Sequence, residues 1–538
     1  MAVDKTEWVI GKVLARQAAA LGDKPFMQFE DQPPVSFAQT DALANRVGNA
    51  LLRMGVVRGQ RVAVMLPNCL EYCYAWFGIS RVGAVHVAIN TAYRGDFLTH
   101  VLNNSGAELM IVHPQYLGWL AAIEDNVPAV QTAIVPGLGQ GDAPRFKRIR
   151  TLPFDALLAA PDTPIDIEVH YSEIGAIMYT SGTTGPSKGV LMPHAHNYLF
   201  GLGEVENLRM VPEDVYYICM PLFHANAMLM QYYGALIVGC RCVIVPAFSA
   251  TNWIGDIRKY GSTITNTLGV MNEFILRQPP QPQERDNRLR LLLAIPVTED
   301  TVARFHRRFG IPKVVEGFGM TECNIPLYYP LDDPEQPGSC GKVYEKYFEL
   351  DIVHPETDEP LPPGEVGELV VRPKEPFCFM QGYNAMPAKS VEAWRNFWFH
   401  TGDAARMDER GYFWYIDRIK DCIRRRGENI SSYELEVVLG DHPDVAEAAA
   451  LAVKSDVPGG EDDVLACLVL KPGTRPRPEE ILDFCTPRMP HFAVPRYVEF
   501  VPELPKTPSM KVQKAKLRDR GLTPQTWDRE AAGYKVRR

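Results

Sequence analysis

A run of sixteen residues carries the clearest chemical signal in this chain. Residues 178–193 read MYTSGTTGPSKGVLMP and follow the apolar stretch 174–178. Glycines at 182, 185 and 189 let the backbone turn closely and point its amides inward, hydroxyls add donors, and a lysine adds a cation. The spacing GxxxxGKS/T of a Walker A loop is absent. The run therefore predicts a different cradle for a polyphosphate, formed by Thr180, Ser181, Gly182, Thr183, Thr184 and Lys188.

Two further motifs place carboxylates beside glycines, hydroxyls and aromatic rings. Residues 316–322 read EGFGMTE. Residues 399–403 read FHTGD, and GYFWYIDR follows at 411–418. Mg²⁺ bound to a nucleotide takes few protein carboxylates and several phosphate oxygens, and a carboxylate suits a pair of ribose hydroxyls. These motifs add two candidate carboxylates, at 322 and 403, to the predicted polyphosphate cradle.

With these three motifs, the chain resembles the adenylate-forming superfamily of acyl-CoA synthetases, peptide-synthetase adenylation domains and firefly luciferase, over nearly its whole length. The resemblance implies that Phe318 stacks on adenine, Thr321 meets the phosphates and Glu322 holds Mg²⁺. It implies that Asp403 binds the ribose hydroxyls, joined by Arg418. The remaining cofactor-binding positions that it implies are Glu316, Gly317 and Gly319.

The C-terminal part carries the family's moving elements. Lys420, within DRIKD at 417–421, occupies the hinge position, and Gly427 matches the glycine that lines the tunnel for the CoA arm. Residues 504–514, LPKTPSMKVQK, resemble the final signature, in which the catalytic lysine matches Lys511. Methionine at 510 replaces the usual glycine, so Lys506 and Lys514 stay open as substitutes.

The reaction that the resemblance implies is the activation of a carboxylic acid as an acyl-AMP by ATP and Mg²⁺, followed by transfer to coenzyme A. A positioned lysine and a metal ion stabilise the charge that concentrates around phosphorus. The residues predicted to act on the reacting groups are Thr184, His224, Glu322 and Lys511. His224 is interpreted as a residue that gates the acyl site, with a packed core histidine as the alternative.

The acyl pocket is expected beside residues 291–296, LLLAIP. Many relatives have small residues here, so Leu293 and Ile295 are expected to fill space that a flat ring or long chain needs. The segment is similar to several carnitine-type ligases. His224 stands where amino-acid-activating members carry an aspartate, which disfavours an amino acid. We therefore expect a short or medium acid, or one with a polar tail.

The elements that position these motifs alternate between helices and apolar strands. Leu43, Val47 and Leu51 recur at helical spacing before Gly55, and residues 61–66 and 108–113 are typical of buried strands. The predicted fold is α/β: a large N-terminal domain of stacked βαβ-type sheets with a small β-barrel-like subdomain, then a small mobile α+β domain. The predicted domains are 1–419, with its β-rich part at about 343–416, and 420–538.

The composition of the chain limits its possible binding partners and cellular location. The 538 residues carry a net charge of −9, which argues against nucleic acid as a partner. Eleven scattered cysteines without a CxxC pair favour a reduced, cytoplasmic protein. No run of 18 apolar residues exists, so an integral membrane association is not expected. The expected partners are a carboxylic acid and CoA, and the chain is expected to be a monomer or homodimer.

Two alternatives stay open. The first is a stand-alone adenylation enzyme that loads a carrier protein; only 27 residues follow Lys511, too few for a fused carrier domain. The second is a non-catalytic binding protein with this fold. The intact residues Lys188, Glu322, Asp403 and Lys511 argue against the second alternative.

Overall fold

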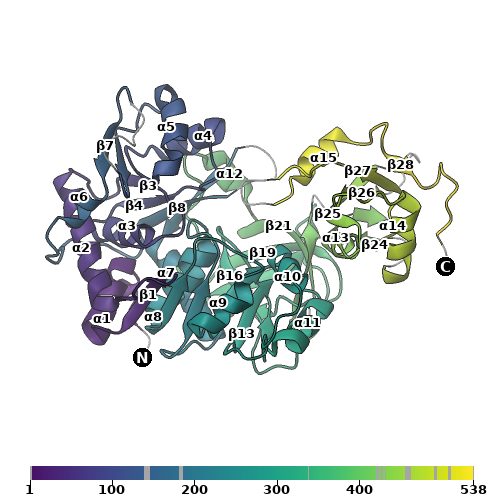
Figure 1. Cartoon of the computed structure of the whole chain (residues 1–538), viewed down its shortest axis with the longest axis horizontal. Coiled ribbons are helices and arrows are strands. Elements are labelled where there is room, and N and C mark those ends of the chain that lie inside the picture. Colours follow the sequence, from purple (N-terminus) through teal and green to yellow (C-terminus); the bar gives the residue numbers. More distant parts are fainter. Residues whose placement is uncertain are drawn as a thin grey trace. The chain divides into compact units, whose positions relative to one another are not determined.

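The structure, a computed structural model, forms two compact units (Figure 1). It describes residues 3–138, 146–180, 186–336, 338–419, 423–425, 428–430, 432–454, 462–489, 493–506 and 511–536. The first unit comprises residues 1–180, 186–350 and 371–399, and the second comprises 181–185, 351–370 and 400–538. The predicted boundary after residue 419 stays a prediction, because residues 420–422 lie outside the described part.

The first sheet of the first unit has seven strands in the order β7-β6-β5-β3-β4-β8-β9. Its strands are β3 (Arg61–Met65), β4 (Val85–Ala88), β5 (Leu109–Val112), β6 (Thr132–Val135), β7 (Arg150–Pro153), β8 (Ile174–Thr180) and β9 (Lys188–Pro193). All pairs are parallel except β8 with β9. The central strands are buried on both faces, which explains their continuous apolar sequence and confirms the strands predicted at 61–66 and 108–113.

The second sheet has seven strands in the order β14-β13-β12-β10-β11-β1-β2. Its strands are β1 (Pro25–Phe29), β2 (Val35–Ser36), β10 (Val215–Ile218), β11 (Arg241–Ile244), β12 (Ile264–Leu268), β13 (Leu291–Ile295) and β14 (Val314–Val315). Figure 1 shows β13 in teal among α9, α10 and α11, while β3, β4 and β8 lie among α2 to α5. The two sheets therefore have separate layers of helices, as expected for βαβ units.

The helices of the first unit are mostly crossovers between parallel strands. They are α1 (Ile10–Leu21), α2 (Phe37–Arg53), α3 (Leu70–Arg81), α4 (Gly95–Ser105), α5 (Leu117–Ala122), α6 (Asp155–Leu158), α7 (His194–Asn207), α8 (Tyr233–Val238), α9 (Trp253–Tyr260), α10 (Gly269–Leu276), α11 (Glu299–Phe309) and α12 (Pro387–Glu392). A π-helical turn, η4 (Asn226–Tyr232), precedes α8. Short 3₁₀ turns are η1 (Lys5–Glu7), η2 (Pro114–Tyr116) and η3 (Glu124–Asn126).

Helix α2 is the helix predicted from the regular spacing of apolar residues before Gly55. Ser36 and Gln39 form a capping box, since the Ser36 hydroxyl accepts from the Gln39 amide at 3.2 Å and the Gln39 side chain accepts from the Ser36 amide at 2.9 Å. Val47 and Leu51 are fully buried. Gly55 follows with φ of 86°, a conformation that favours glycine. The helix predicted there is confirmed.

Smaller antiparallel sheets follow in the chain. One has the order β15-β16-β17, with β15 (Gly317–Met320), β16 (Asn324–Tyr328) and β17 (Lys342–Val343). Another has the order β18-β19-β21-β20, with β22 paired to β21. Its strands are β18 (Phe348–Val353), β19 (Gly367–Pro373), β20 (Trp394–Arg395), β21 (Trp398–Met407) and β22 (Phe413–Arg418). This sheet confirms the predicted β-rich subdomain.

The end of the chain is a small α+β domain, as predicted. A four-stranded sheet has the order β25-β26-β27-β28, with β25 (Val445–Lys454), β26 (Asp462–Leu470), β27 (Tyr497–Phe500) and β28 (Trp527–Asp528). The other elements are β23 (Ile423–Arg425), β24 (Glu428–Ile430), α13 (Ser432–Gly440), α14 (Pro478–Cys485), η5 (Thr486–Arg488) and α15 (Lys514–Arg520). The domain has its own core, in which Leu439, Leu468 and Leu482 are fully buried.

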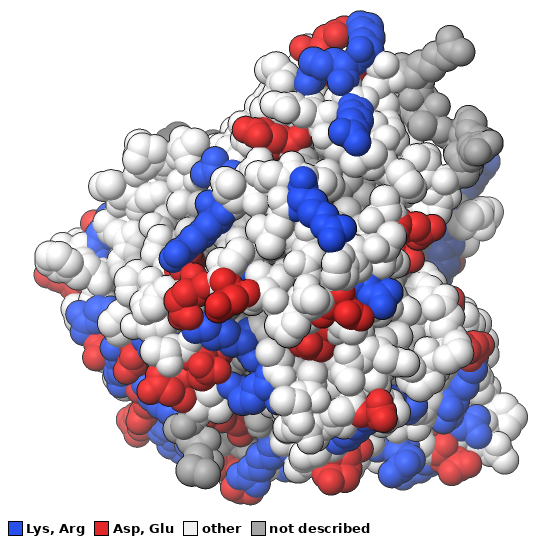
Figure 2. Space-filling view, turned by 90° about the vertical axis from the view of Figure 1, so that its left-hand side faces the viewer, with Lys and Arg blue, Asp and Glu red and all other residues white. Residues whose placement is uncertain are grey.

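The surface carries charges of both signs. Figure 2 shows one face, on which basic and acidic side chains are interspersed among uncharged residues. Within the part of the chain that the structure describes, no helix is long and apolar enough to cross a membrane.

Candidate functional site

Glu322 is a buried carboxylate in contact with Thr180, one of the predicted phosphate-binding residues. Its side chain lies just after β15, and the residue is 4% exposed. One oxygen, Oε1, accepts hydrogen bonds from the Tyr383 hydroxyl at 3.1 Å and the Thr180 hydroxyl at 3.4 Å. One carboxylate with neighbouring hydroxyls suits Mg²⁺, which draws most of its ligands from phosphate and water. The residues present thus fit a nucleotide-bound Mg²⁺.

Lys188 lies beside the same cluster. Thr180 ends β8 and Lys188 begins β9, and the two residues are direct cross-strand partners. The Lys188 ammonium lies 4.1 Å from the centroid of the Tyr383 ring, within cation–π range. The structure therefore places a cation, a hydroxyl and a carboxylate at the base of the glycine-rich loop. The predicted contacts of Ser181, Gly182, Thr183 and Thr184 lie outside the described residues.

Tyr383 was not among the residues predicted from the sequence. It is held by a segment that runs beside β9: the Gln381 amide donates to the Leu191 carbonyl at 2.9 Å, and the Asn384 amide donates to the Gly189 carbonyl at 2.7 Å. Its hydroxyl reaches Glu322, which is 61 positions away in the sequence. No local pattern around position 383 signals this contact, because it depends on the tertiary path of the chain.

The strand that carries the predicted adenine-stacking residue has little room. Phe318 is 7% exposed. A Cβ on Gly319 would stand 2.1 Å from Cδ1 of Ile325 and 2.6 Å from the carbonyl oxygen of Asn324. A Cβ on Gly317 would stand 3.0 Å from the Leu327 carbonyl oxygen. Glycine at 319 is therefore required by close packing of β15 against β16.

His196, on α7, supports the same strand and was also missed by sequence reasoning. Its Nε2 lies 2.9 Å from the carbonyl oxygen of Thr321, and its Nδ1 lies 3.2 Å from Nδ2 of Asn324. Burial lowers the pKa of His196 to about 4, so the ring is neutral near pH 7. A neutral ring donates from Nε2 to Thr321 and accepts at Nδ1 from Asn324, so each ring nitrogen has a matching partner.

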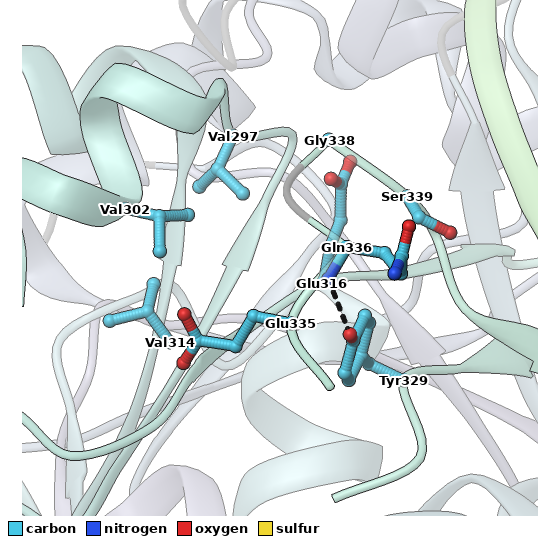
Figure 3. Close-up of a pocket in the computed structure, with 9 residues that line it drawn as sticks. All are labelled: Val297, Val302, Val314, Glu316, Tyr329, Glu335, Gln336, Gly338 and Ser339. Carbon is cyan, nitrogen blue, oxygen red and sulfur yellow. Dashed lines mark hydrogen bonds between the residues drawn. The ribbon is translucent and has the colours of Figure 1, made fainter. Parts of the chain in front are cut away.

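The Glu316 side chain lines a small cavity (Figure 3). The cavity has a volume of about 10 Å³ and is lined by Val297, Val302, Val314, Glu316, Tyr329, Glu335, Gln336, Gly338 and Ser339. The Cys340 thiol lies 3.9 Å from Oε1 of Glu316. Burial raises the pKa of the Glu316 carboxyl to about 8, so it is neutral near pH 7. Its predicted contact with the nucleotide stays a prediction.

In the second unit, Asp403 and Arg418 form a pair across neighbouring strands. They are direct partners in the β21–β22 ladder, and Arg418 Nε lies 2.9 Å from Oδ1 of Asp403. The Asp403 side chain is 2% exposed, whereas that of Arg418 is 41% exposed. The guanidinium compensates the buried carboxylate and reaches the surface, as the predicted ribose contact requires.

Three lysines near the C-terminus differ in their surroundings. Lys514 Nζ lies 2.7 Å from Oε1 of Glu436 and is largely buried, and Lys506 is paired with Glu447. Lys511 is exposed. Lys506 and Lys514 are thus held by ion pairs within the small domain, and the catalytic role of Lys511 stays a prediction. The predicted roles of Lys420 and Gly427 lie outside the described residues.

The predicted acyl-pocket residues belong to the second sheet and the turn before η4. Leu293 is 1% exposed and Ile295 is half-buried. Cδ1 of each lies 3.9 Å from the position of a Cβ on Gly317, so both point toward β15. His224 is half-buried, and its ring centroid lies 4.5 Å from that of Phe223. Leucine and isoleucine thus occupy space next to the strand that carries Phe318.

Comparison with known proteins identifies the family of this chain. The sequence model of the family described as "AMP-binding enzyme" matches residues 14–384, and that of "AMP-binding enzyme C-terminal domain" matches residues 434–511. A crotonobetaine/carnitine–CoA ligase of Salmonella heidelberg is 28% identical over 518 residues, which cover 93% of this chain and 97% of that protein.

Two solved structures illustrate the similarity of fold. The anthranilate CoA ligase AuaEII in complex with anthranoyl-AMP has a TM-score of 0.84 at 28% identity, covering 95% of this chain and 97% of that one. ATP-bound MatB from Rhodopseudomonas palustris has a TM-score of 0.81 at 26% identity, covering 95% and 98%. These similarities confirm the predicted fold class and superfamily.

Proposed function

The chain belongs to the AMP-binding enzyme family, and from this premise we propose that it is an ATP-dependent carboxylate–CoA ligase whose acid is short or medium in length, or polar-tailed. The observation that carries the proposal is the cluster of Glu322, Thr180, Tyr383 and Lys188 beside the glycine-rich loop. Relatives matched over most of their length are named as CoA ligases. Loading of a carrier protein is therefore not favoured.

In the first half-reaction, a carboxylate oxygen of the acid attacks the α-phosphorus of ATP, and the bond to pyrophosphate breaks. Lys188 and the hydroxyl of Thr180 bind the departing phosphates, and the Lys511 ammonium stabilises the charge on the reacting oxygens. Glu322 would hold Mg²⁺, which neutralises phosphate charge when bound. Tyr383 and His196 hold Glu322 and Thr321 in place.

In the second half-reaction, the CoA thiol, which has lost its proton to water, attacks the acyl carbon as a thiolate, and the bond between that carbon and the phosphate oxygen breaks to release AMP. Asp403 accepts hydrogen bonds from the ribose hydroxyls while Arg418 holds its carboxylate, so the nucleotide stays bound as the acyl group transfers. The sequence resemblance assigns the passage of the CoA arm to Gly427. Leu293 and Ile295 fill the far end of the acyl site, which limits the length of the acid.

A panel of acids tests the proposal. The purified protein is assayed for ATP–pyrophosphate exchange with short, medium, aromatic and polar-tailed acids, and then for thioester formation with free CoA. We expect exchange with short or polar acids, and conversion of the same acids to CoA thioesters. Exchange without any CoA thioester would favour a carrier protein as acceptor. Location in the cytoplasm and the monomeric or homodimeric state remain predictions.

A further inference from the structure

A continuous chain of buried polar side chains runs from helix α7 to the π-helical turn η4. Its members are Glu204 on α7, Tyr216 on β10, Asn266 on β12, and Asn226 and Gln231 on η4. The first three and Gln231 are at most 1% exposed, whereas Asn226 is half-buried. The catalytic steps proposed above use none of these residues.

The distances connect all five residues. The Tyr216 hydroxyl lies 2.9 Å from Oε2 of Glu204 and 2.6 Å from Oδ1 of Asn266. Nδ2 of Asn266 donates to Oδ1 of Asn226 at 3.2 Å. Nε2 of Gln231 donates to the same Oδ1 at 2.7 Å. Buried polar groups of this kind are held in one arrangement, because breaking any link leaves an unsatisfied group.

The direction of the hydrogen bonds follows from counting protons. A tyrosine hydroxyl has one proton, so it donates to only one of its two oxygen neighbours. If Tyr216 donates to Asn266, a neutral Glu204 must donate to Tyr216. Burial supports this assignment, since it raises the pKa of the Glu204 carboxyl to about 8. The amide of Asn266 then presents its oxygen to Tyr216 and its nitrogen to Asn226.

Asn226 is thereby fixed in one orientation. Its Oδ1 accepts from two donors, and turning the amide over would place an NH₂ group against both of them. Its Nδ2 makes no hydrogen bond to any residue that the structure describes. The side chain therefore turns an unpaired donor away from the buried network.

Asn226 is linked through Asn266 to the strand that carries the residues predicted to form the acyl pocket. Asn266 and Leu293 are register partners on parallel strands, so they share one face of the second sheet. Leu293 points toward β15, and Asn226 lies two residues beyond His224. The π-helical turn itself is a rare conformation that is frequent at functional sites, and here it sets Gln231 against Asn226.

We propose that Asn226 is a specificity-determining residue that donates a hydrogen bond from Nδ2 to an acceptor oxygen of the acyl substrate. The substrate class is then a short or medium carboxylic acid with a second oxygen, such as a keto, amide or hydroxyl group, beyond the reacting carboxylate. This inference rests on the proposed function, because it concerns the acid that is activated. Glu204, Tyr216, Asn266 and Gln231 are positioning residues.

Matched acids with and without the acceptor oxygen test the inference. Levulinate is compared with isocaproate, and acetoacetate with isovalerate, because the two acids of each pair have the same number of non-hydrogen atoms and differ in that a methyl branch replaces the keto oxygen. The measurement is kcat/KM in ATP–pyrophosphate exchange. We expect the unchanged enzyme to prefer the keto acids by about 10-fold or more, since a pocket donor left unpaired penalises the hydrocarbon analogue.

Asn226→Ala should bring this ratio to about 1. Asn226→Asp keeps an acceptor for Asn266 and Gln231 and therefore keeps the fold, but it turns a carboxylate to the substrate. It should reject the keto acids and gain activity with a trimethylammonium acid of similar length. Tyr216→Phe should reduce the ratio while sparing the hydrocarbon acids. Asn103→Asp, on the exposed side of α4, is the matched control and should leave the ratio unchanged.

The inference is overturned if the unchanged enzyme shows a kcat/KM ratio of keto acid to hydrocarbon acid near 1, or if Asn226→Asp keeps the ratio of the unchanged enzyme. In either case, ATP–pyrophosphate exchange with the hydrocarbon acids would still support the proposed ligase function. Absence of exchange with every acid overturns both the inference and the proposed function.

Discussion

Replacing Glu204 with glutamine should remove a pH-dependent loss of stability from the first unit. Glu204 is 0% exposed on α7, and burial raises the pKa of its carboxyl from the ordinary 4.5 to about 8. In the unfolded chain this carboxyl loses its proton near its ordinary pKa, whereas the folded chain keeps the proton. The folded state therefore binds more protons in this range, and its stability falls as pH rises from 4.5 toward 8.

The size of the effect follows from the shift. One unit of pKa corresponds to roughly 1.4 kcal/mol, so the free energy of unfolding should fall by about 3 kcal/mol between about pH 5.5 and about pH 8. Glutamine at 204 donates from its amide to Tyr216 just as the neutral acid does, but it has no proton to lose. The variant should keep the network and lack this part of the pH dependence.

Thermal unfolding across this pH range is the assay. At roughly 1.3 °C for each kcal/mol in a unit of this size, the difference in Tm between Glu204→Gln and the unchanged protein should grow by about 4 °C in favour of the variant. Glu206→Gln is the control on the same helix, because Glu206 is partly exposed and paired with Lys346 at 2.9 Å. Its difference in Tm should stay small at all pH values, as for other surface ion pairs.

A difference that stays constant with pH would refute the reasoning. Glu204 would then be ionised in the folded protein, Tyr216 would donate to it, and the amides of Asn266 and Asn226 would be reversed. The preference for substrates with an acceptor oxygen would lose its structural basis at the same time.

Four further predictions concern the catalytic groups. Glu322→Gln should greatly reduce adenylation with an unchanged fold, because an amide binds Mg²⁺ poorly; normal pyrophosphate release at ordinary Mg²⁺ would contradict the assignment. Tyr383→Phe removes one donor to Glu322 but keeps the ring beside Lys188, so KM for Mg-ATP should rise by about 3- to 10-fold at most, measured by initial rates. Leu293→Gly should shift preference toward longer or bulkier acids in the exchange panel, since each methylene of space is worth about 1–3 kcal/mol; an unchanged acid profile would show that Leu293 does not limit the site. Lys511→Ala should slow acyl-AMP formation by roughly 100-fold or more yet spare thioester formation from supplied acyl-AMP, and Gly427→Trp should do the reverse; equal loss of both half-reactions in both variants would exclude an alternation between them.

Local pattern was enough to predict much of the architecture. The strands at β3 and β5 are short apolar runs bounded by polar residues, and α2 begins at a capping box and ends before Gly55. These signals lie within a few residues of one another, because backbone hydrogen bonding and burial of one face are decided locally. The glycine-rich loop has a local signal of the same kind, because its glycines and hydroxyls are adjacent in the sequence, but its contacts with a nucleotide stay a prediction.

The supports of the site depended on tertiary structure. Tyr383 meets Glu322 across 61 positions, and His196 meets Thr321 across 125. Neither contact produces a recognisable pattern in the sequence, because each joins two segments that come together only in the folded chain.

The buried network shows the same division most clearly. Glu204 looks in the sequence like an ordinary charged residue of a helix, and Asn226 like a polar residue in a loop. Only folding removes Glu204 from water, which keeps its proton in place and sets the direction of each hydrogen bond as far as Asn226. The residue types were determined by the sequence, but their protonation and orientation follow from desolvation and close contact, which the tertiary structure alone creates.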